Sequence, residues 1–152
     1  MISFEGIPAI YFNSMFGTSN DINKYIISNN KRDLNRFKWS SDRLNKLLNN
    51  KNSKHYLIYE EITNLLSIKQ KNKAFHPNAV RKTINLGSKI FAFKRISLDN
   101  KQTVMCISNL SSKTQYIKIQ LKNKNYRELI IGTIVRKNNI SLDPFQTIWL
   151  SN

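Results

Sequence analysis

The acidic residues of this chain do not form the cooperating pair of carboxylates that acid–base or nucleophilic catalysis uses. The chain contains nine aspartates and glutamates. Glu60 and Glu61 are neighbours on a predicted helix, where adjacent positions do not face each other. Asp21 and Asp33 share one long polar loop, but no motif around them would bring their carboxylates together. We therefore predict no catalytic residue within the chain.

The same loop carries residues that could hold a substrate. It contains the pair Asn20 and Asp21 and, further on, the segment RDLNR at residues 32–36. A guanidinium group is planar and permanently charged, and it suits bidentate contacts with carboxylates, hydroxyls and phosphates. We predict that Arg32 pairs structurally with Asp21 or Asp33. The residue types alone leave open whether Arg36 contacts a ligand or forms a structural salt bridge. Asn20 and Asp21 either shape a turn or contact the substrate.

The histidines and the cysteine give no metal or redox pattern. His55 falls on the surface of a predicted helix and His76 precedes Pro77. Two isolated histidines without cysteine or acid spacing do not make a metal site. Cys106 lies in an apolar run, which predicts a small buried side chain and no disulfide within the chain. We predict neither a metal nor a cofactor.

The polar loop, residues 13–38, follows an apolar stretch at residues 6–12. Its apolar residues do not alternate with polar ones, which favours a strand buried on both faces, as in a parallel sheet or barrel. The loop that follows such a strand in a (β/α)₈ barrel lines the active site. Beyond the loop, Ser40 to Asp42 are expected to begin a short helix. A longer helix is expected from about Lys54 to Lys71, with an apolar stripe typical of a helix packed on a barrel.

After residue 73 the helical periodicity ends and short β-type runs appear, separated by turn residues. Ile117, Ile119 and Leu121 alternate with Lys118 and Gln120, which is typical of a half-buried strand. The predicted strands are residues 81–86, 90–98, 103–110, 115–121, 128–131 and 146–150. Short strands at this spacing indicate a small antiparallel β-sandwich. The chain as it stands therefore has an α+β pattern with a boundary near residues 73 and 74.

The composition of this chain of 152 residues is strongly basic, with a net charge of +16. Such an excess normally suggests nucleic acid or an anionic surface as partner. Here the basic residues are scattered through all predicted elements, and we interpret them as a drift toward Lys, Asn and Ile. Nucleic acid is therefore not the expected partner. No stretch reaches the roughly 20 apolar residues of a membrane span, and residues 1–5 do not resemble a signal peptide. We expect a cytoplasmic protein with no membrane partner.

Four segments, in order, resemble sucrose-phosphorylase-like enzymes of the α-amylase superfamily of glycoside hydrolases. Three of them are similar to the end of the catalytic domain: GIPAIYF (residues 6–12), GTSND (17–21) and RDLNR (32–36). The fourth, AFHPNA (74–79), is similar to the segment after the last barrel helix in glucosylglycerate and sucrose-6-phosphate phosphorylases. The resemblance covers the whole chain, which corresponds to the last third or less of such an enzyme.

The resemblance implies that residues 1–73 are the C-terminal end of a TIM-barrel catalytic domain, with strand 8, the active-site loop and the last helices. Residues 74–152 would be a C-terminal antiparallel β domain. The full enzyme would transfer an α-glucosyl unit with retention, as a phosphorylase or a hydrolase, using carboxylates from earlier strands that this chain lacks. Arg36 occupies the position whose arginine helps to fix the glucosyl ring. The implied ligands are a sugar and phosphate, with no cofactor, and Asn20 and Asp21 are further substrate-binding candidates.

On this interpretation the chain is a truncated, inactive part of the enzyme, and a separate chain carrying the rest of the barrel is a candidate partner. Two other interpretations remain open. The chain could be a non-catalytic, basic, β-rich module that binds polysaccharide or nucleic acid, or a degenerate remnant. Binding to heparin or DNA that survives about 0.5 M salt would favour the binding module.

Overall fold

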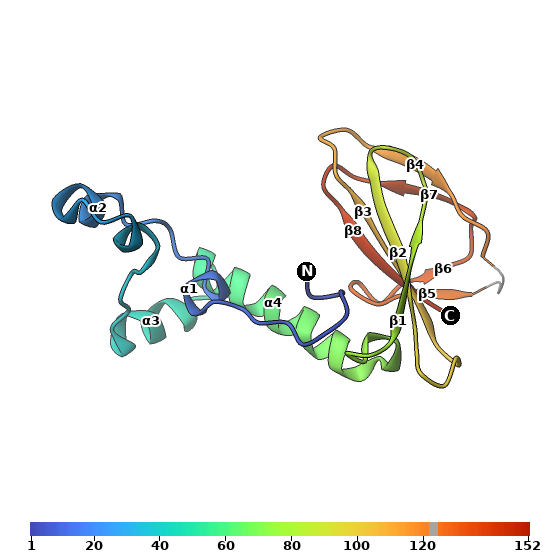
Figure 1. Ribbon diagram of the computed structural model, residues 1–152, viewed down its shortest axis with the longest axis horizontal. Coiled ribbons are helices and arrows are strands. Elements are labelled where there is room, and N and C mark those ends of the chain that lie inside the picture. The colour runs from blue at the N-terminus through green and yellow to red at the C-terminus, as the bar shows by residue number, and fades with distance from the viewer. Residues whose placement is uncertain (122–124) are drawn as a thin grey trace. The chain divides into compact units, whose positions relative to one another are not determined.

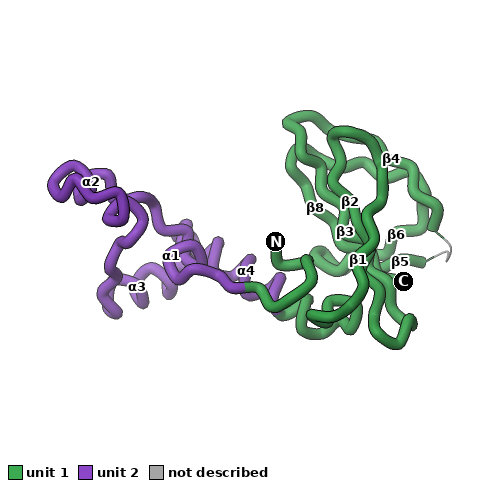
Figure 2. The backbone as a smooth tube through the Cα atoms, viewed as in Figure 1, with its two compact units in different colours: residues 1–8, 67–152 green, residues 9–66 purple. Residues whose placement is uncertain are grey.

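The structure is a computed structural model that describes residues 1–121 and 125–152. It contains two compact units (Figure 2): a β unit made of residues 1–8 and 67–152, and a helical unit made of residues 9–66. Helix α4 (Lys54–Lys71) begins in the helical unit and ends in the β unit. The predicted combination of helices with an antiparallel sheet is confirmed.

The β unit contains two antiparallel sheets (Figure 1). The larger sheet has six strands in the order β1-β2-β3-β8-β5-β6, and the smaller one pairs β4 with β7. The strands are β1 (Val80–Ile84), β2 (Ile90–Ile96), β3 (Thr103–Asn109), β4 (Gln115–Lys118), β5 (Tyr126–Glu128), β6 (Ile134–Val135), β7 (Asn139–Leu142) and β8 (Thr147–Ser151). A short 3₁₀ helix, η2 (Lys73–Phe75), joins α4 to β1.

The main core of the β unit is built from residues of both sheets. Ile107 of β3 faces Ala92 of β2 and Ile148 of β8 in the register of the larger sheet. Ile117 of β4 and Leu142 of β7 belong to the same buried cluster. Strand β4 shows the alternation expected from its sequence, because Ile117 is buried between two exposed neighbours. Alternating apolar residues therefore give each sheet one face for this core.

The other face of the large sheet is also covered. Phe93, Cys106 and Trp149 are neighbours across β2, β3 and β8, and each is almost fully buried. The ring of Phe4 stacks on Phe93 with centroids 5.3 Å apart, and the ring of Phe75 lies 4.9 Å from that of Trp149. Burial raises the pKa of the Cys106 thiol to about 12. The predicted role of Cys106 as a small buried side chain is confirmed.

Arg95 holds the segment at the start of the chain against this face. The side chain is fully buried, and its guanidinium donates to the carbonyl oxygens of Ser3 (2.9 Å), His76 (2.7 Å) and Ala79 (3.2 Å). A buried charge is tolerated only when polar groups surround it, and here backbone carbonyls take that role. Residues far apart in sequence are thereby joined through one side chain.

Lys69, near the end of α4, binds the same segment. Its ammonium group donates to the carbonyl oxygens of Ile2 (2.9 Å) and Phe4 (3.1 Å). Desolvation lowers the pKa of Lys69 below its usual value. Glu5 adds an ion pair with Arg81 at 2.8 Å. Residues 1–8 are therefore an integral part of the β unit.

Glu128 ends β5 and begins a turn. Its buried carboxylate accepts the backbone N–H of Trp149 at 2.9 Å and that of Ile131. The strand predicted over residues 128–131 is wrong in its bounds, because β5 ends at Glu128 and a turn follows. Strands β6 and β7 were not predicted. The other five predicted strands are confirmed, with ends that differ by up to three residues.

The helical unit consists of short helices around the first part of α4. They are α1 (Phe12–Met15), α2 (Ile22–Ser28), the 3₁₀ helix η1 (Lys31–Asn35) and α3 (Ser41–Leu48). Both predicted helices are confirmed, and the second has the predicted bounds. Gly17 lies close to α4 with a φ of +57°, where a Cβ would overlap the end of the Ile58 side chain. Only glycine fits this close approach without strain.

The strand predicted over residues 6–12 is wrong for this chain. No residue of this stretch belongs to a sheet, and α1 begins at Phe12. A strand needs a neighbouring strand that shares its backbone hydrogen bonds, and none of the described strands pairs with this stretch, whose Gly6 donates its N–H to the carbonyl of Pro77. The side chain of Ile7 is 85% exposed as a result. The barrel unit and the sandwich remain predictions.

Candidate substrate-binding site

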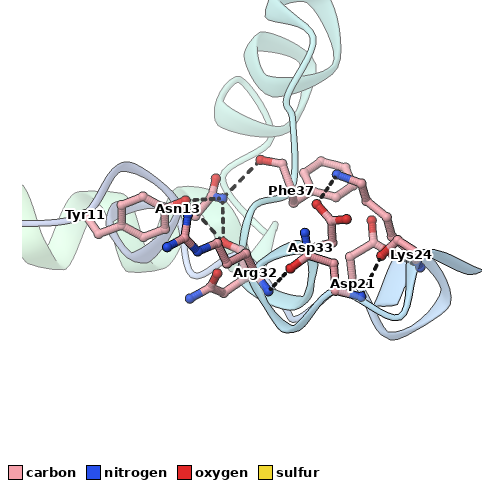
Figure 3. Close-up of polar contacts among 10 residues, drawn as sticks. Tyr11, Asn13, Asp21, Lys24, Arg32, Asp33 and Phe37 are labelled. Atoms are coloured by element: carbon pink, nitrogen blue, oxygen red, sulfur yellow. Dashed lines mark hydrogen bonds and ion pairs between the residues drawn. The ribbon is translucent and has the colours of Figure 1, made fainter. Parts of the chain in front are cut away.

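Asn13 fixes the backbone on both sides of Arg36 (Figure 3). Its buried side-chain amide donates to the carbonyl oxygens of Asn35 (3.2 Å) and Phe37 (3.0 Å). The hydroxyl of Tyr11 donates to the same Asn35 carbonyl at 3.2 Å. Three hydrogen bonds thus hold residues 35–37 against the start of the helical unit. Sequence reasoning missed Asn13 because its partners are backbone carbonyls. Every residue has one, so these contacts leave no signature in the sequence.

Arg36, the first of the predicted binding residues, is the C-cap of η1 and is exposed. It lines a shallow cavity of about 380 Å³ together with Tyr11, Lys31, Arg32 and Asn35. Its side chain makes no ion pair within the described part of the chain. The alternative role of Arg36 as a structural ion pair therefore has no partner among those residues.

Asn20 and Asp21, the other two predicted binding residues, line a different depression. Asp21 accepts the backbone N–H of Lys24 at 3.0 Å and so caps the start of α2. The second depression has a volume of about 280 Å³ and also includes Trp39 and His55. The three predicted binding residues are therefore not gathered in one cavity, and the carboxylate of Asp21 serves as the N-cap of α2.

Asp33 forms its ion pair with Lys24 at 3.0 Å, as Figure 3 shows. The predicted pairing of Arg32 with Asp21 or Asp33 is not observed in the described residues. Lys24 on α2 reaches Asp33 because Asp21 and Leu34 are joined by a backbone hydrogen bond of 2.7 Å. The hydrogen bond from Lys24, and then that from Ser28, hold the pKa of Asp33 below its usual range.

An aromatic cluster supports the second depression. The guanidinium of Arg43 lies 5.4 Å from the ring centre of Phe37 and 5.7 Å from that of Trp39. The indole N–H of Trp39 donates to the Thr18 hydroxyl at 3.0 Å. His55 Nδ1 lies 2.6 Å from the carbonyl oxygen of Phe16, and because a carbonyl only accepts, Nδ1 carries the proton. The signal for this cluster in the sequence was the pair Phe37 and Trp39, followed by Arg43.

Several acids of the chain have structural partners. Glu5 pairs with Arg81, and Glu60 accepts the Tyr56 hydroxyl at 2.7 Å. Asp99 accepts the Ser97 hydroxyl at 2.6 Å. Glu128 accepts from backbone amides, and Asp33 pairs with Lys24. The carboxylates of these acids therefore have structural roles. Retaining transfer of a glycosyl group needs two carboxyl groups about 5–5.5 Å apart.

The described residues contain no group of three or more His, Cys, Asp or Glu side chains placed to hold a metal ion. Within the same part of the chain, none of the helices combines the length and the apolar character that crossing a membrane would need.

Curated relatives align along almost the whole chain. It is 26% identical over 151 residues to the glucosylglycerate phosphorylase of Escherichia coli K12, covering 99% of this chain and 26% of that protein. It is also 26% identical over 150 residues to the glucosylglycerate phosphorylase of Allomeiothermus silvanus, covering 99% of this chain and 25% of the relative. No family model matches. The chain thus spans about a quarter of the length of these relatives.

Solved structures with a similar fold also match part of this chain. An Anoxybacillus α-amylase has a TM-score of 0.56 and 23% identity over 67% of this chain and 23% of that one. AmyP in complex with maltose has a TM-score of 0.58 and 13% identity over 66% of this chain and 21% of its own. A MutB variant in complex with sucrose has a TM-score of 0.54 and 15% identity over 71% of this chain and 19% of its own.

The fold is that of the C-terminal region of α-amylase-family structures. Within that class, the matched curated relatives confirm the resemblance to sucrose-phosphorylase-like enzymes. Homologues of this chain are therefore glycosyl-transferring enzymes.

Proposed function

We propose that this chain supplies the C-terminal, substrate-holding part of an α-glucosyl-transferring glycoside phosphorylase. The observation that carries the proposal is the alignment with glucosylglycerate phosphorylases along 99% of the chain. In the full enzyme, a carboxylate would attack the anomeric carbon and break the glycosidic bond, while a second carboxyl group protonates the departing oxygen, to form a covalent glucosyl–enzyme intermediate. Attack by phosphate on that intermediate would release glucose 1-phosphate with retained configuration.

Arg36 would hold the glucosyl ring in this enzyme, and Asn20 and Asp21 would lie toward the acceptor. The exposure of Arg36 and its freedom from ion pairs within the described residues support a ligand-binding role. The hydrogen bonds of Asn13 support it further, because a fixed backbone lowers the entropy lost when the side chain binds. Arg36 would then be a binding residue with no part in proton transfer.

The catalytic carboxylates would come from outside this chain, since the resembled enzymes take them from earlier barrel strands and Glu5, Asp33 and Glu128 are held here by the contacts described above. A separate chain that carries the rest of the barrel is the proposed partner. Three isoleucines of α2 support such an interface: Ile22, Ile26 and Ile27 are 60%, 69% and 87% exposed. The proposed location is the cytoplasm, where sugar phosphates are metabolised.

A complementation assay tests this proposal. The purified chain would be mixed with a glucosylglycerate phosphorylase shortened by the region that aligns with it, and release of glucose 1-phosphate from glucosylglycerate and from sucrose would be measured. We expect the chain alone and the shortened enzyme alone to be inactive, and the mixture to be active. Turnover that follows the isolated chain through purification, or an inactive mixture, would contradict the proposal.

Within the active mixture, Arg36→Lys should lower kcat/KM by about 10- to 100-fold, because lysine cannot reproduce the fork of a guanidinium. Arg127→Lys is the matched control, since Arg127 is exposed on β5. It should leave kcat/KM within about twofold. A thermal midpoint lowered by Arg36→Lys with unchanged kinetics would instead give Arg36 a structural role.

The net charge of +16 supports a second candidate, a basic module that binds polysaccharide or nucleic acid. Retention on heparin or DNA above about 0.5 M salt, together with failed complementation, would favour it.

A further inference from the structure

The cover over the larger sheet of the β unit stops short of one end. On the face opposite the smaller sheet, the first residues of the chain and η2 cover the region around Phe93 and Trp149. Further along the strands, Phe91, Ser108 and Thr147 are neighbours across β2, β3 and β8. Side chains two residues apart on a strand share a face, so this row lies on the same face as Phe93 and Trp149. Phe91 and Thr147 are exposed, which marks the limit of the cover.

Two further apolar side chains lie at this end of the sheet. Leu110 follows β3 and is 62% exposed, and Phe145 precedes β8 and is 69% exposed. Backbone hydrogen bonds hold both beside their neighbours: the N–H of Leu110 donates to the carbonyl of Lys89 at 2.9 Å, and that of Phe145 to the carbonyl of Ser111 at 3.1 Å. We call Phe91, Leu110 and Phe145 the apolar end of the sheet.

Phe145 is held in a backbone conformation that phenylalanine rarely adopts. It occupies the third position of a turn over residues 143–146, in which the N–H of Gln146 donates to the carbonyl of Asp143 at 3.1 Å. Its φ is +57°, and glycine or asparagine is the usual residue at a turn position with positive φ. A bulky side chain is strained there, and such strain persists only where the surrounding contacts impose it. The fold therefore presents an exposed aromatic ring although this lowers its own stability.

Asn109 provides contacts that impose this turn. Its buried side-chain amide donates to the carbonyl oxygen of Asp143 at 2.9 Å, and its amide oxygen accepts the N–H of Ser111 at 2.9 Å. The side chain of Gln146 accepts the N–H of Asp143 at 2.8 Å. Because the turn is fixed before a partner binds, Phe145 loses little conformational freedom on binding.

The chemistry of the apolar end favours a protein over a sugar as its ligand. Phenylalanine and leucine side chains have no hydrogen-bonding group, whereas sugar hydroxyls need partners once they leave water. The hydroxyls of Ser108 and Thr147, in the row of Phe91, bond to each other at 2.8 Å. Aromatic side chains on a rigid support are typical anchors of protein interfaces. An apolar protein surface is therefore the fitting ligand.

The position of residue 1 indicates which protein this is. The chain matches the C-terminal region of α-amylase-family structures and spans about a quarter of its curated relatives. In those proteins the remaining polypeptide precedes this region and reaches it at the position of residue 1. Here the first residues lie on the face that carries the apolar end, because Ser3 binds Arg95 and Phe4 stacks on Phe93. Phe91 continues this aromatic layer, with its ring 6.0 Å from that of Phe4.

We propose that the apolar end of the sheet is a docking surface for the part of the glycoside phosphorylase that this chain does not contain. The inference rests on the proposed function for the identity of the partner, and it adds a contact surface on the β unit to the one on α2. Phe145 is the central anchor. The core of the β unit forms without this ring, so the surface is present in the folded chain before binding.

Phe145→Asn tests the surface, because asparagine tolerates a positive φ and the substitution removes the aromatic ring. The variant is titrated into the shortened glucosylglycerate phosphorylase of the complementation assay. The Kd for that enzyme, measured by isothermal titration calorimetry, should rise at least about tenfold. Activity at a saturating concentration of the chain should stay within about twofold, since Phe145 takes no part in substrate binding. The urea midpoint of the variant should not fall, because the substitution relieves strain.

Tyr116→Asn is the matched control. Tyr116 lies on β4 of the smaller sheet and is 84% exposed, so the substitution removes another exposed ring from the same unit. It should change the Kd for the shortened enzyme by less than about twofold. Leu110→Ser removes a second member of the apolar end and should raise that Kd at least about threefold.

An unchanged Kd for Phe145→Asn, an equal rise for Tyr116→Asn, or a lowered urea midpoint of Phe145→Asn would overturn the docking surface. If the wild-type chain restores activity and Phe145→Asn does so at the same concentration, only this inference fails. If the wild-type chain binds the shortened enzyme more tightly than Phe145→Asn but restores no activity, only the proposed enzyme fails. Absence of binding by the wild-type chain would refute both.

Discussion

The β unit and the helical unit differ in how much apolar surface they bury by themselves. In the described residues, every buried apolar side chain except Phe16 belongs to the β unit. Helices α2, α3 and α4 contain no fully buried residue. The β unit, by contrast, covers both faces of its larger sheet, one with the smaller sheet and one with residues 1–8 and 73–75.

The β unit therefore buries its own apolar side chains, whereas the helical unit leaves apolar side chains of α2 uncovered. Burial of one isoleucine stabilises a fold by roughly 1.5–3 kcal/mol, and the three isoleucines of α2 forgo most of that. The helical unit is held by the aromatic cluster around Trp39, by the packing of Phe16 on Tyr59, and by polar contacts such as those of Asn13. We therefore expect the β unit to set the global stability and the helical unit to open locally.

The largest predicted effect is on the β unit. Arg95→Met keeps much of the side-chain volume but leaves the carbonyls of Ser3, His76 and Ala79 without their donor. The free energy of unfolding, measured with urea, should fall by about 3–5 kcal/mol. Arg127→Met removes an exposed arginine from the same unit and should cost less than about 0.5 kcal/mol. Similar losses in the two variants would show that the contacts of Arg95 are unimportant.

An intermediate effect is expected in the helical unit. Gly17→Ala adds a methyl group that overlaps the side chain of Ile58 at a φ of +57°. The cost to this unit should be about 2–4 kcal/mol. With 5-fluorotryptophan, Trp39 reports on the helical unit and Trp149 on the β unit, so only the Trp39 signal should lose its native position.

Gly132→Ala is the matched control, because Gly132 has a φ of +87° but open space around its Cβ position. It should lower the stability of the β unit by about 1 kcal/mol, and only the Trp149 signal should change. A Trp39 signal untouched by Gly17→Ala would contradict the close packing of this turn on α4.

The smallest effect concerns pH. The Ser97 hydroxyl, with the backbone N–H of Lys101, lowers the pKa of Asp99 from 3.8 to about 2. Folding therefore favours the ionised carboxylate, and its stabilisation is present above pH 3.8 and lost as the pH falls toward 2. Asp99→Asn should flatten the loss of stability of the β unit in that range. An unchanged pH dependence would exclude this contribution.

Local patterns predicted the helices and most strands well. The periodicity around Ile58 and Ile62 specified α4, and the alternation around Ile117 specified β4. Strands β6 and β7 escaped prediction because they have only two and four residues, too few to show an alternating pattern. The strand over residues 6–12 failed because a strand depends on neighbours, which no local pattern can supply.

The site was only partly predictable for a related reason. Arg36 and the loop could be singled out from residue types, and the resemblance gave Arg36 a role. The contacts of Asn13 and Arg95 could not be foreseen, since both side chains bind backbone carbonyls that are distant in sequence. Lys24 became the partner of Asp33 through the fold of α2 against η1, which spacing alone does not specify.

Native-state hydrogen exchange of the isolated chain tests the contrast between the two units most directly. Amides in β3 and β8 should exchange only through global unfolding, whereas those of α2 and α3 should be protected by less than about 2 kcal/mol. Exchange in α2 as slow as in β3 would contradict the incomplete burial of the helical unit, and with it the proposal of a covering partner.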